Sequence, residues 1–360
     1  MKVGALLGIF VAHRVLVDAV ESEHGLPGCA VNCIEWSVRT ESTCADGDMW
    51  CLCADDRLDE AMRACLARLC TLRETMSALN ITTSRCQQPV RDRTHIPTIV
   101  ASVTGGLAML AVLIRTMIGL LDGQFGWHDA CALGAGIWAI PMNAMQFPLS
   151  AAGFGKDIWT IPLENVTRIQ KLVWSTQIFY WPTTTLSRFA FLLLYLRIFP
   201  RERFRRWVYA AMGLNFFYWS FFQFSNLFQC RPMWMVWKGW DGEHEGSCWN
   251  INKLMLSAAG YTIVLDLIVI VLPVGELLQL QLSGKRKLGI IGNFVVGTFM
   301  WIISVIKIWA ISTFAESTNT TWNDVPGDYW SVMEANMSVI CVCIKMSVLS
   351  FTQTGRSKPW

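Results

Sequence analysis

Residues 29–86 decide how the N-terminal part of this chain folds, and they read CAVNCIEWSVRTESTCADGDMWCLCADDRLDEAMRACLARLCTLRETMSALNITTSRC. Eight of the 13 cysteines in the 360-residue chain lie in this stretch. A segment this short buries too little apolar surface to be stable unaided, and one disulfide typically stabilises a small domain by roughly 2–4 kcal/mol. The cysteine density therefore predicts four disulfides and an oxidising compartment outside the cytosol.

The spacing of these cysteines limits how they can pair, although eight cysteines formally allow many connectivities. Cys29 and Cys33 share one face of a helix, and Cys65 and Cys70 lie roughly side by side on a second helical segment. Two such helices running antiparallel would be joined by two bridges, which leaves one loop closure and one bridge to the end of the domain. The favoured pairs are therefore Cys29–Cys70, Cys33–Cys65, Cys44–Cys51 and Cys53–Cys86.

A zinc site at Cys51 and Cys53 is the weaker interpretation of the same cysteines. Zinc sites favour two or more residues between ligands and nearby histidine, whereas one residue separates this pair. No histidine lies between residues 29 and 86.

Several of these residues also carry a resemblance to a known family. The run Pro27-Gly28-Cys29, the run Asp48-Met49-Trp50-Cys51-Leu52-Cys53 and every gap between the eight cysteines resemble the fungal CFEM domain. This is a small extracellular module with eight cysteines. The resemblance implies a compact basket of helices at a fungal cell surface, which we place at residues 20–95.

Asp48 is the residue for which this resemblance implies the most specific chemistry. It matches the position whose carboxylate is the axial haem-iron ligand in haem-binding CFEM proteins, and Asp46 is a weaker alternative. An apolar platform would come from Met49, Trp50 and Leu52. A carboxylate is a hard ligand that favours ferric iron. The alternative interpretation is that Asp48 only accepts backbone hydrogen bonds in its turn, as aspartate commonly does.

The first residues of the chain are typical of a secretory signal peptide. Lys2 precedes an apolar run over residues 3–12, and small residues follow around Ala19. This pattern predicts a signal peptide over residues 1–19. His13 and Arg14 interrupt the apolar run, so a disordered leader is the alternative.

The composition excludes an ordinary soluble protein, because 53% of the residues are hydrophobic and only 16% are charged. After residue 93 the chain contains seven long apolar stretches, each near the roughly 20 residues that cross a bilayer as a helix. They cover residues 96–121, 130–150, 173–199, 207–228, 254–280, 288–314 and 330–351. We therefore predict an all-α protein with a seven-helix transmembrane domain over residues 96–352 and a short cytoplasmic tail over residues 353–360.

Cationic residues predict the orientation of this domain. The loop after the third stretch contains Arg201, Arg203, Arg205 and Arg206, and the loop after the fifth contains Lys285, Arg286 and Lys287. The positive-inside rule places both loops in the cytoplasm and the N-terminus outside. In this topology three glycosylation sequons lie outside, at Asn80, Asn165 and Asn319, whereas a fourth at Asn336 lies within the seventh stretch and should be silent.

Two further cysteines, Cys230 and Cys248, bracket the predicted outer loop between the fourth and fifth stretches. We expect a fifth disulfide there. Two free buried thiols are the alternative, since cysteine often serves as a small apolar residue.

The seven-helix part resembles the fungal rhodopsin-like family of receptor-like membrane proteins, which often carry a CFEM domain and include sensors of host surfaces. The matching pieces are Gly153-Phe154-Gly155-Lys156, Tyr195-Leu196-Arg197-Ile198-Phe199-Pro200, Phe228-Gln229-Cys230-Arg231-Pro232 and Trp330-Ser331-Val332-Met333-Glu334. The sequence departs from the family after Cys343, where a Leu-Pro-rich stretch and a long polar tail usually follow.

Ionisable residues inside the apolar stretches are candidates for function, because each is costly in a membrane unless it is paired or hydrated. They are Arg115, Arg188, Asp266, Lys307, Glu334 and Lys345. Lys345 suggests a retinal Schiff base, but the third stretch lacks an acidic counter-ion, so retinal is not expected. Neither a zinc-protease motif nor a glycine-rich phosphate loop occurs, so we do not expect an enzyme.

The resemblance therefore implies a plasma-membrane receptor-like protein that senses extracellular or host-surface cues and signals to a heterotrimeric G protein. We expect no nucleic-acid partner. Arg197, Arg203 and Arg205 are the residues predicted to couple to the pathway, with a purely topological role as the alternative. A membrane-anchored haem- or iron-binding protein is the alternative function, and a transporter is the third.

Overall fold

The computed structural model describes residues 26–42, 44, 48–123, 125–278, 297–299, 301–312 and 319–354, with side chains described up to residue 344. The predicted signal peptide, Asp46 and the basic loop at residues 285–287 lie outside these ranges, as does most of the predicted tail. The chain divides into two compact units. The first comprises residues 1–91, 157–162 and 238–245, and the second comprises the remainder.

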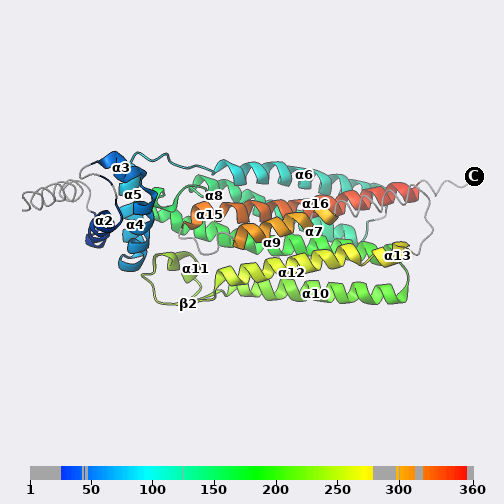
Figure 1. Ribbon diagram of the computed structural model, residues 1–360. Helices are drawn as coiled ribbons and strands as arrows, with labels where there is room; N and C mark the ends of the chain where they lie inside the picture. The colour runs from blue at the N-terminus through cyan, green and yellow to red at the C-terminus, as the bar shows by residue number, and fades with distance from the viewer. Residues whose placement is uncertain are drawn as a thin grey trace, which may run out of the picture. The chain divides into compact units, whose positions relative to one another are not determined.

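Four helices build the first unit, and Figure 1 labels each of them: α2 (Gly28–Thr40), α3 (Met49–Ala54), α4 (Asp56–Leu69) and α5 (Leu72–Arg85). Side chains define where three of them begin. Asp48 and Asp55 accept backbone hydrogen bonds at the starts of α3 and α4, and Thr71 forms a reciprocal capping box with Glu74 at the start of α5. The same hydrogen bonds lower the pKa of the exposed Glu74 carboxyl.

The disulfides of this unit are the four that the spacing predicts. Two of them join α2 to α4, as expected for antiparallel helices, and the full set is Cys29–Cys70, Cys33–Cys65, Cys44–Cys51 and Cys53–Cys86. Their shared core is small and includes Ala30, Leu66 and Met76. The disulfides therefore stabilise this unit, because its core is too small to do so alone.

Two segments from far along the chain complete the first unit. The 3-10 helix η1 (Ile158–Thr160) contributes Trp159, over whose ring the Arg63 guanidinium lies 4.8 Å from the centroid. Asp157, beside it, pairs with Arg91. Residues 238–245 contribute Glu243, whose Oε1 lies 3.2 Å from Arg73 Nε. These two segments lie outside the predicted domain boundaries of residues 20–95. Sequence patterns define a domain only as one continuous stretch, so they do not reveal segments that join it from elsewhere in the chain.

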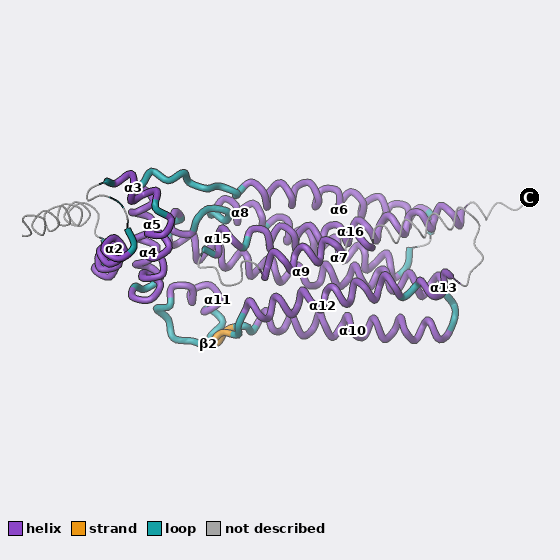
Figure 2. Tube along the Cα trace, in the orientation of Figure 1, coloured by secondary structure: helices purple, strands orange, loops and turns teal. Residues whose placement is uncertain are grey.

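The second unit consists mainly of long helices, which Figure 2 shows in purple. They are α6 (His95–Leu121), α7 (Trp127–Ala144), α8 (Gln146–Ala151), α9 (Leu163–Ile198), α10 (Glu202–Leu227), α12 (Ile251–Val271), α13 (Val274–Leu278), α15 (Thr320–Asn323) and α16 (Val325–Thr354), together with helical residues 297–299 and 301–312. A short hairpin pairs β1 (Cys230–Arg231) with β2 (Ser247–Cys248) and contains the predicted Cys230–Cys248 disulfide. The loop between the two strands contains α11 (Met235–Lys238) and η2 (Gly239–Asp241), and its residues 238–245 belong to the first unit.

Large and small side chains of helix α6 differ in where they lie. Its large apolar residues face outward and are more than half exposed, as at Val103, Leu107 and Met117. Most of its buried residues are small, as at Ala101, Gly105 and Ala108, and the buried Arg115 is the large exception. Large apolar side chains outside and small ones at helix contacts are the arrangement expected in lipid, where close backbone approach drives packing.

Two helical segments of the described chain are long and apolar enough to cross a membrane: α6 and the stretch Ile251–Glu276. They correspond to the first and fifth predicted stretches. Helices also cover the second, third, fourth and seventh, but these carry more polar residues, and α7 and α9 contain Pro141 and Pro182. The sixth stretch is described from residue 297 onward and is helical there.

The four sequons differ in how their asparagines are exposed. Asn80 is exposed on α5 and Asn165 is half-buried in the first turn of α9. Asn336 is fully buried, which agrees with the expectation that it is silent. Asn319 departs from the prediction: only 7% of its surface is exposed at the start of α15, so a glycan would have to displace packed neighbours.

We predict that Asn80→Gln removes a glycan, and that Asn336→Gln, the matched buried control, removes none. The measurement is the shift in gel mobility of the expressed protein after enzymatic deglycosylation. Asn319→Gln should have little effect because that side chain is buried. An unchanged shift in Asn80→Gln would contradict an extracellular first unit.

Candidate ligand cavity and buried ionic network

A cavity of about 230 Å³ lies within the second unit. Its walls come from α9, α12, helical residues 301–312 and the chain from α15 into α16. Polar and aromatic side chains line it, among them Gln177, Tyr180, Trp181, Lys307, Asp324 and Asp328. This volume lies below the roughly 300–1,000 Å³ of pockets that hold drug-sized molecules, so the cavity suits a small ligand.

Helix α9 supplies the aromatic wall of the cavity although Pro182 interrupts it. A proline inside a helix removes one backbone hydrogen bond, which neighbouring hydroxyl groups can compensate in membrane helices. Here the hydroxyl of Thr183 donates to the Phe179 carbonyl at 2.8 Å, and that of Thr184 donates to the Tyr180 carbonyl at 3.3 Å. These hydroxyls support the carbonyls that follow Ile178, whose own helical partner is missing at Pro182, and the helix continues for 36 residues.

The cavity borders a buried ion pair between Lys307 and Glu334. The Tyr180 hydroxyl lies 3.0 Å from Lys307 Nζ and donates to Glu334 Oε2 at 2.9 Å. All three side chains are buried, and Glu334 is only 1% exposed. A charge so enclosed needs a partner and further hydrogen bonds, and this triad provides both.

A serine extends the triad into a larger network. Ser304 Oγ lies 3.1 Å from both Glu334 Oε1 and Asp266 Oδ2, and its one hydroxyl proton can be donated to either carboxylate. Asp266 in turn accepts from Arg188 Nε at 2.8 Å. Two cations and two anions thus neutralise one another, on α9, α12, α16 and helical residues 301–312.

This network contains four of the six ionisable residues that the sequence singled out. Arg115 lies elsewhere: its Nε donates to Asp129 Oδ1 at 2.7 Å, and both side chains are buried. The side chain of Lys345 lies outside the described part of the chain.

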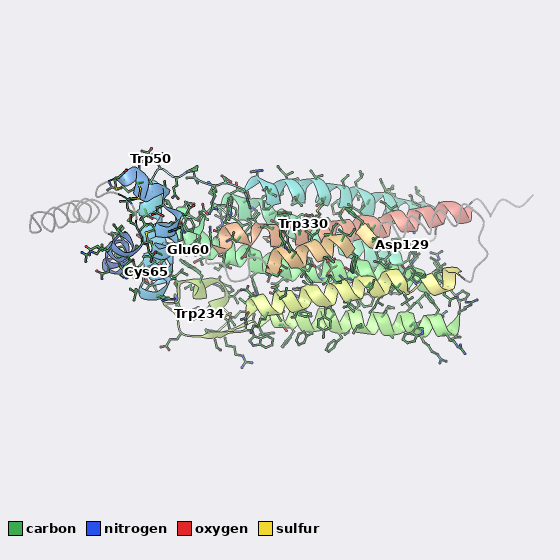
Figure 3. The ribbon with its side chains drawn as sticks, viewed as in Figure 1. Trp50, Glu60, Cys65, Asp129, Trp234 and Trp330 are labelled. Carbon is green, nitrogen blue, oxygen red and sulfur yellow. A yellow bond between two sulfur atoms is a disulfide. The ribbon has the colours of Figure 1, made fainter. Side chains whose placement is uncertain are left out.

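Asp129, labelled in Figure 3, belongs to a second polar cluster at the start of α7. His128 Nε2 lies 3.3 Å from both Asp129 Oδ2 and Arg197 Nη1. Burial lowers the pKa of His128, whereas the Asp129 carboxylate opposes that change. A chain of contacts thus runs from Arg115 to the last turn of α9. Sequence reasoning missed His128 and Asp129 because they precede the second apolar stretch.

The residues predicted to couple to a cytoplasmic pathway lie where α9 ends and α10 begins. Arg197 is in the last turn of α9, and Arg203 is exposed in the first turn of α10. Arg205 Nη2 donates to the Tyr209 hydroxyl at 3.3 Å. Arg201 Nη1 lies 2.7 Å from Glu276 Oε2 on α13. The structure therefore brings these arginines to one end of the second unit.

Asp48, the predicted haem ligand, caps α3 in the structure. Its Oδ1 accepts from the backbone N–H of Cys51 at 3.1 Å, which is the alternative role considered for it. The next two residues are unusually exposed for their type: Met49 is 44% exposed, and Trp50, labelled in Figure 3, is 85% exposed. The Asp48 carboxylate and two exposed apolar side chains are therefore adjacent in the sequence of the first unit.

These features define a helical membrane protein with a disulfide-bonded N-terminal unit. The family model of the fungal rhodopsin domain matches residues 112–352, and the model of the CFEM domain matches residues 22–87. The chain therefore belongs to the fungal rhodopsin domain family and carries a CFEM domain. Both resemblances seen in the sequence are confirmed.

Three similar proteins come from fungi. The chain is 32% identical over 187 residues to a SAT4 family membrane protein of Emericella nidulans, covering 51% of this chain and 45% of that protein. It is 30% identical over 160 residues to Satratoxin biosynthesis SC1 cluster protein 4 of Stachybotrys chartarum, covering 44% and 57%. Fugralins biosynthesis cluster protein 2 of Gibberella zeae is 21% identical over 128 residues, covering 35% and 31%.

The aligned part thus spans about half the length of the first two of these relatives. No solved structure matches the chain significantly.

We predict that removing one partner of the buried pair destabilises the protein more than removing both. Lys307→Met leaves Glu334 uncompensated and should cost roughly 3–5 kcal/mol, whereas the double variant Lys307→Met, Glu334→Leu should recover much of that loss. The measurement is denaturant or thermal unfolding of the purified protein. Tyr180→Phe, which removes no charge, should cost only about 1 kcal/mol. A double variant as unstable as the sum of both single variants would contradict the pairing.

Proposed function

We propose that this protein is a multi-pass plasma-membrane receptor with its N-terminus outside, which senses an extracellular or host-surface cue and signals to an intracellular G-protein-type pathway. The observation that carries the proposal is the course of α9. This helix lines the cavity with Gln177 and Trp181, places Arg188 in the buried network and ends near Arg197. One rigid element therefore connects a ligand-sized cavity to the basic segment.

The length of this connection supports the proposal. From Trp181 to Arg197 the helix rises about 24 Å, most of the thickness of a bilayer core of roughly 30 Å. Between them, Arg188 pairs with Asp266 on α12. Displacement of α9 by a ligand would therefore be transmitted both along its own axis and to α12.

The seven-helix topology is part of the proposal. It is supported by the outward apolar side chains of α6, α10 and α12, since lipid rather than water suits residues such as Leu107, Phe217 and Val264, each about half exposed or more. The exposed arginines between α9 and α10 suit the cytoplasmic side. Membership of a membrane-protein family and the membrane-protein name of the Emericella nidulans relative agree with this arrangement.

Arg197 is the residue through which we propose that the signal leaves the bundle. In the structure its guanidinium is held at His128, which is beside the buried Arg115–Asp129 pair. Movement of the end of α9 relative to α7 would release this contact and change how the basic segment is presented to a partner.

We predict that the triple variant Arg197→Lys, Arg203→Lys, Arg205→Lys reaches the surface but signals several-fold less. Lysine keeps the positive charge that sets topology and lacks the planar fork that binds carboxylates bidentately. The measurement is the cyclic-nucleotide response to a host-surface cue in cells that express the variant. Surface labelling and glycosylation serve as the readout of topology.

Arg168→Lys is the matched control, because Arg168 is an exposed arginine in the early turns of the same helix. It should leave the response unchanged. A triple variant that reached the surface and responded like the natural protein would remove the coupling role from these arginines.

A second candidate function is haem or iron binding by the CFEM domain. The observation that favours it is the pair of exposed apolar residues, Met49 and Trp50, directly after the Asp48 carboxylate. When bound, ferric haem would supply an iron centre that prefers a hard oxygen ligand. In this proposal Asp48 supplies that oxygen, and the helical unit serves mainly as an anchor.

We predict that Asp48→Asn weakens ferric-haem binding by about tenfold or more, since loss of a direct ligand should exceed the cost of losing an outer partner. Asparagine caps a helix about as well as aspartate, so this change removes the anionic ligand while α3 is retained. The measurement is a Soret-band titration of the purified full chain. Asp55→Asn, at the start of α4, is the matched control and should bind haem normally. Equal affinity in both variants would exclude Asp48 from a haem site.

A further inference from the structure

We propose that the cavity of the second unit binds a small organic cation, a protonated amine or quaternary ammonium attached to an apolar group, through Asp324, Asp328 and the aromatic wall of α9. This inference deepens the proposed receptor function, on which it rests for its biological role, by naming the class of ligand.

The charge of the lining residues favours a cation. Among the described residues that line the cavity, the acidic ones are Asp324 and Asp328 and the basic one is Lys307. Glu334 and Tyr180 already surround the ammonium group of Lys307. The two aspartates have no such cationic partner within the described chain. The wall therefore presents two carboxyl groups that carry uncompensated negative charge when they are ionised.

Buried polar atoms without a partner identify where a ligand would bind. Asp328 Oδ1 accepts from Gln146 Nε2 at 3.4 Å, but Asp328 Oδ2 has no hydrogen-bond partner. The same is true of Gln229 Oε1, although only 3% of the Gln229 side chain is exposed. Both residues line the cavity. Leaving such atoms unpaired is costly, and two free acceptors suit a ligand that donates N–H groups.

Trp181 adds a free donor to this set. Its Nε1 has no partner, and its side chain is 3% exposed and also lines the cavity. A hydroxyl or ether oxygen on the ligand would satisfy it. The cavity thus combines two acceptors with one donor, a pattern that a free inorganic cation cannot satisfy.

Aromatic residues favour an organic cation over a neutral molecule. Trp174, Tyr180 and Trp181 line the cavity on α9. Aromatic rings attract ammonium groups through their negative faces, most strongly when the contact is desolvated. Apolar side chains complete the wall, including Val173, Met255 and Ile311. A volume of about 230 Å³ leaves space for one ring or short chain beside the ammonium group.

The acidic residue should couple binding to pH. Burial, followed by the charge of Asp324, raises the pKa of Asp328 to about 7, while the hydrogen bond from Gln146 opposes that change. Burial also raises the pKa of Asp324 to about 7, and Lys307 and Tyr180 are the remaining titratable groups of the lining. A cation prefers the ionised form of Asp328. Affinity should therefore be full above about pH 7 and fall as the pH drops below it.

The test uses purified full-length protein in lipid nanodiscs and benzyltrimethylammonium as the probe, with affinity measured by calorimetry and by tryptophan fluorescence. Neopentylbenzene is its uncharged carbon isostere, and phenylacetate is the anionic comparison. At about pH 8 the cation should bind about tenfold more tightly than either. At about pH 6 its affinity should fall by about tenfold or more, as expected for protonation of carboxyl groups with pKa values near 7.

Asp328→Asn should weaken binding about tenfold and reduce the dependence on pH, which Asp324 alone then carries. Asp324→Asn changes a more exposed side chain, so it tests the same site if Asp328→Asn does not fold. Asp122→Asn is the matched control, because Asp122 is exposed at the end of α6 and does not line the cavity. Absence of cation binding, equal binding of the isostere, or normal affinity in both cavity variants would overturn the inference.

The measurement is independent of signalling. Cation binding without a cytoplasmic response would support this inference and remove the receptor function. A response to a host-surface cue in a protein that binds no cation would support the receptor function and overturn the inference of a cation site.

Discussion

The mutual neutralisation of four buried charges constrains the arrangement of the helical unit. Lys307, Glu334, Asp266 and Arg188 lie on four different helical segments, and Ser304 links the two carboxylates. An isolated charge in this environment would cost several kcal/mol, so a shift of any one helix would leave an uncompensated ion. The network therefore sets the register of the helices around the cavity. It also explains why the lysine beside the cavity is unavailable to an anionic ligand.

Elsewhere in the helical unit, neutral polar side chains are paired between helices in the same way as the charges are. Asn143 and Asn336 exchange reciprocal amide hydrogen bonds of 2.9 and 2.8 Å, and Asn336 also donates to Thr104. Gly105 leaves the space for Asn143, since a Cβ atom at Gly105 would lie 2.7 Å from Asn143 Cγ. Lipid provides no hydrophobic drive between helices, so small residues and satisfied polar pairs stabilise these contacts. The disulfide-bonded unit is stabilised differently, by covalent bonds around a small core. Because these bonds hold the helices together, Trp50 is not needed in the core and is exposed.

The two proposed functions depend on different parts of this construction. Receptor function depends on α9, which carries cavity residues, a buried arginine and a terminal arginine on one continuous helix. Haem binding depends on α3 and its capping carboxylate. A change in one unit therefore tests one function without removing the side chains that the other requires.

The disulfide pairs were predictable from sequence, because helical periodicity limits which cysteines share a face. Helices over the apolar stretches were predictable because long runs of apolar residues with few charges favour helices of membrane-spanning length. The sequence also identified the four ionisable residues of the network as candidates for function, but it did not show which residue pairs with which. Arg188 and Asp266 are 78 residues apart in sequence, and only packing of α9 against α12 brings them to 2.8 Å. Tertiary structure likewise decided that Asn319 is buried, that Trp159 joins the disulfide-bonded unit, and that Gln229 and Asp328 share one cavity. Contacts between distant segments depend on how whole helices pack, and local sequence patterns carry no record of that packing.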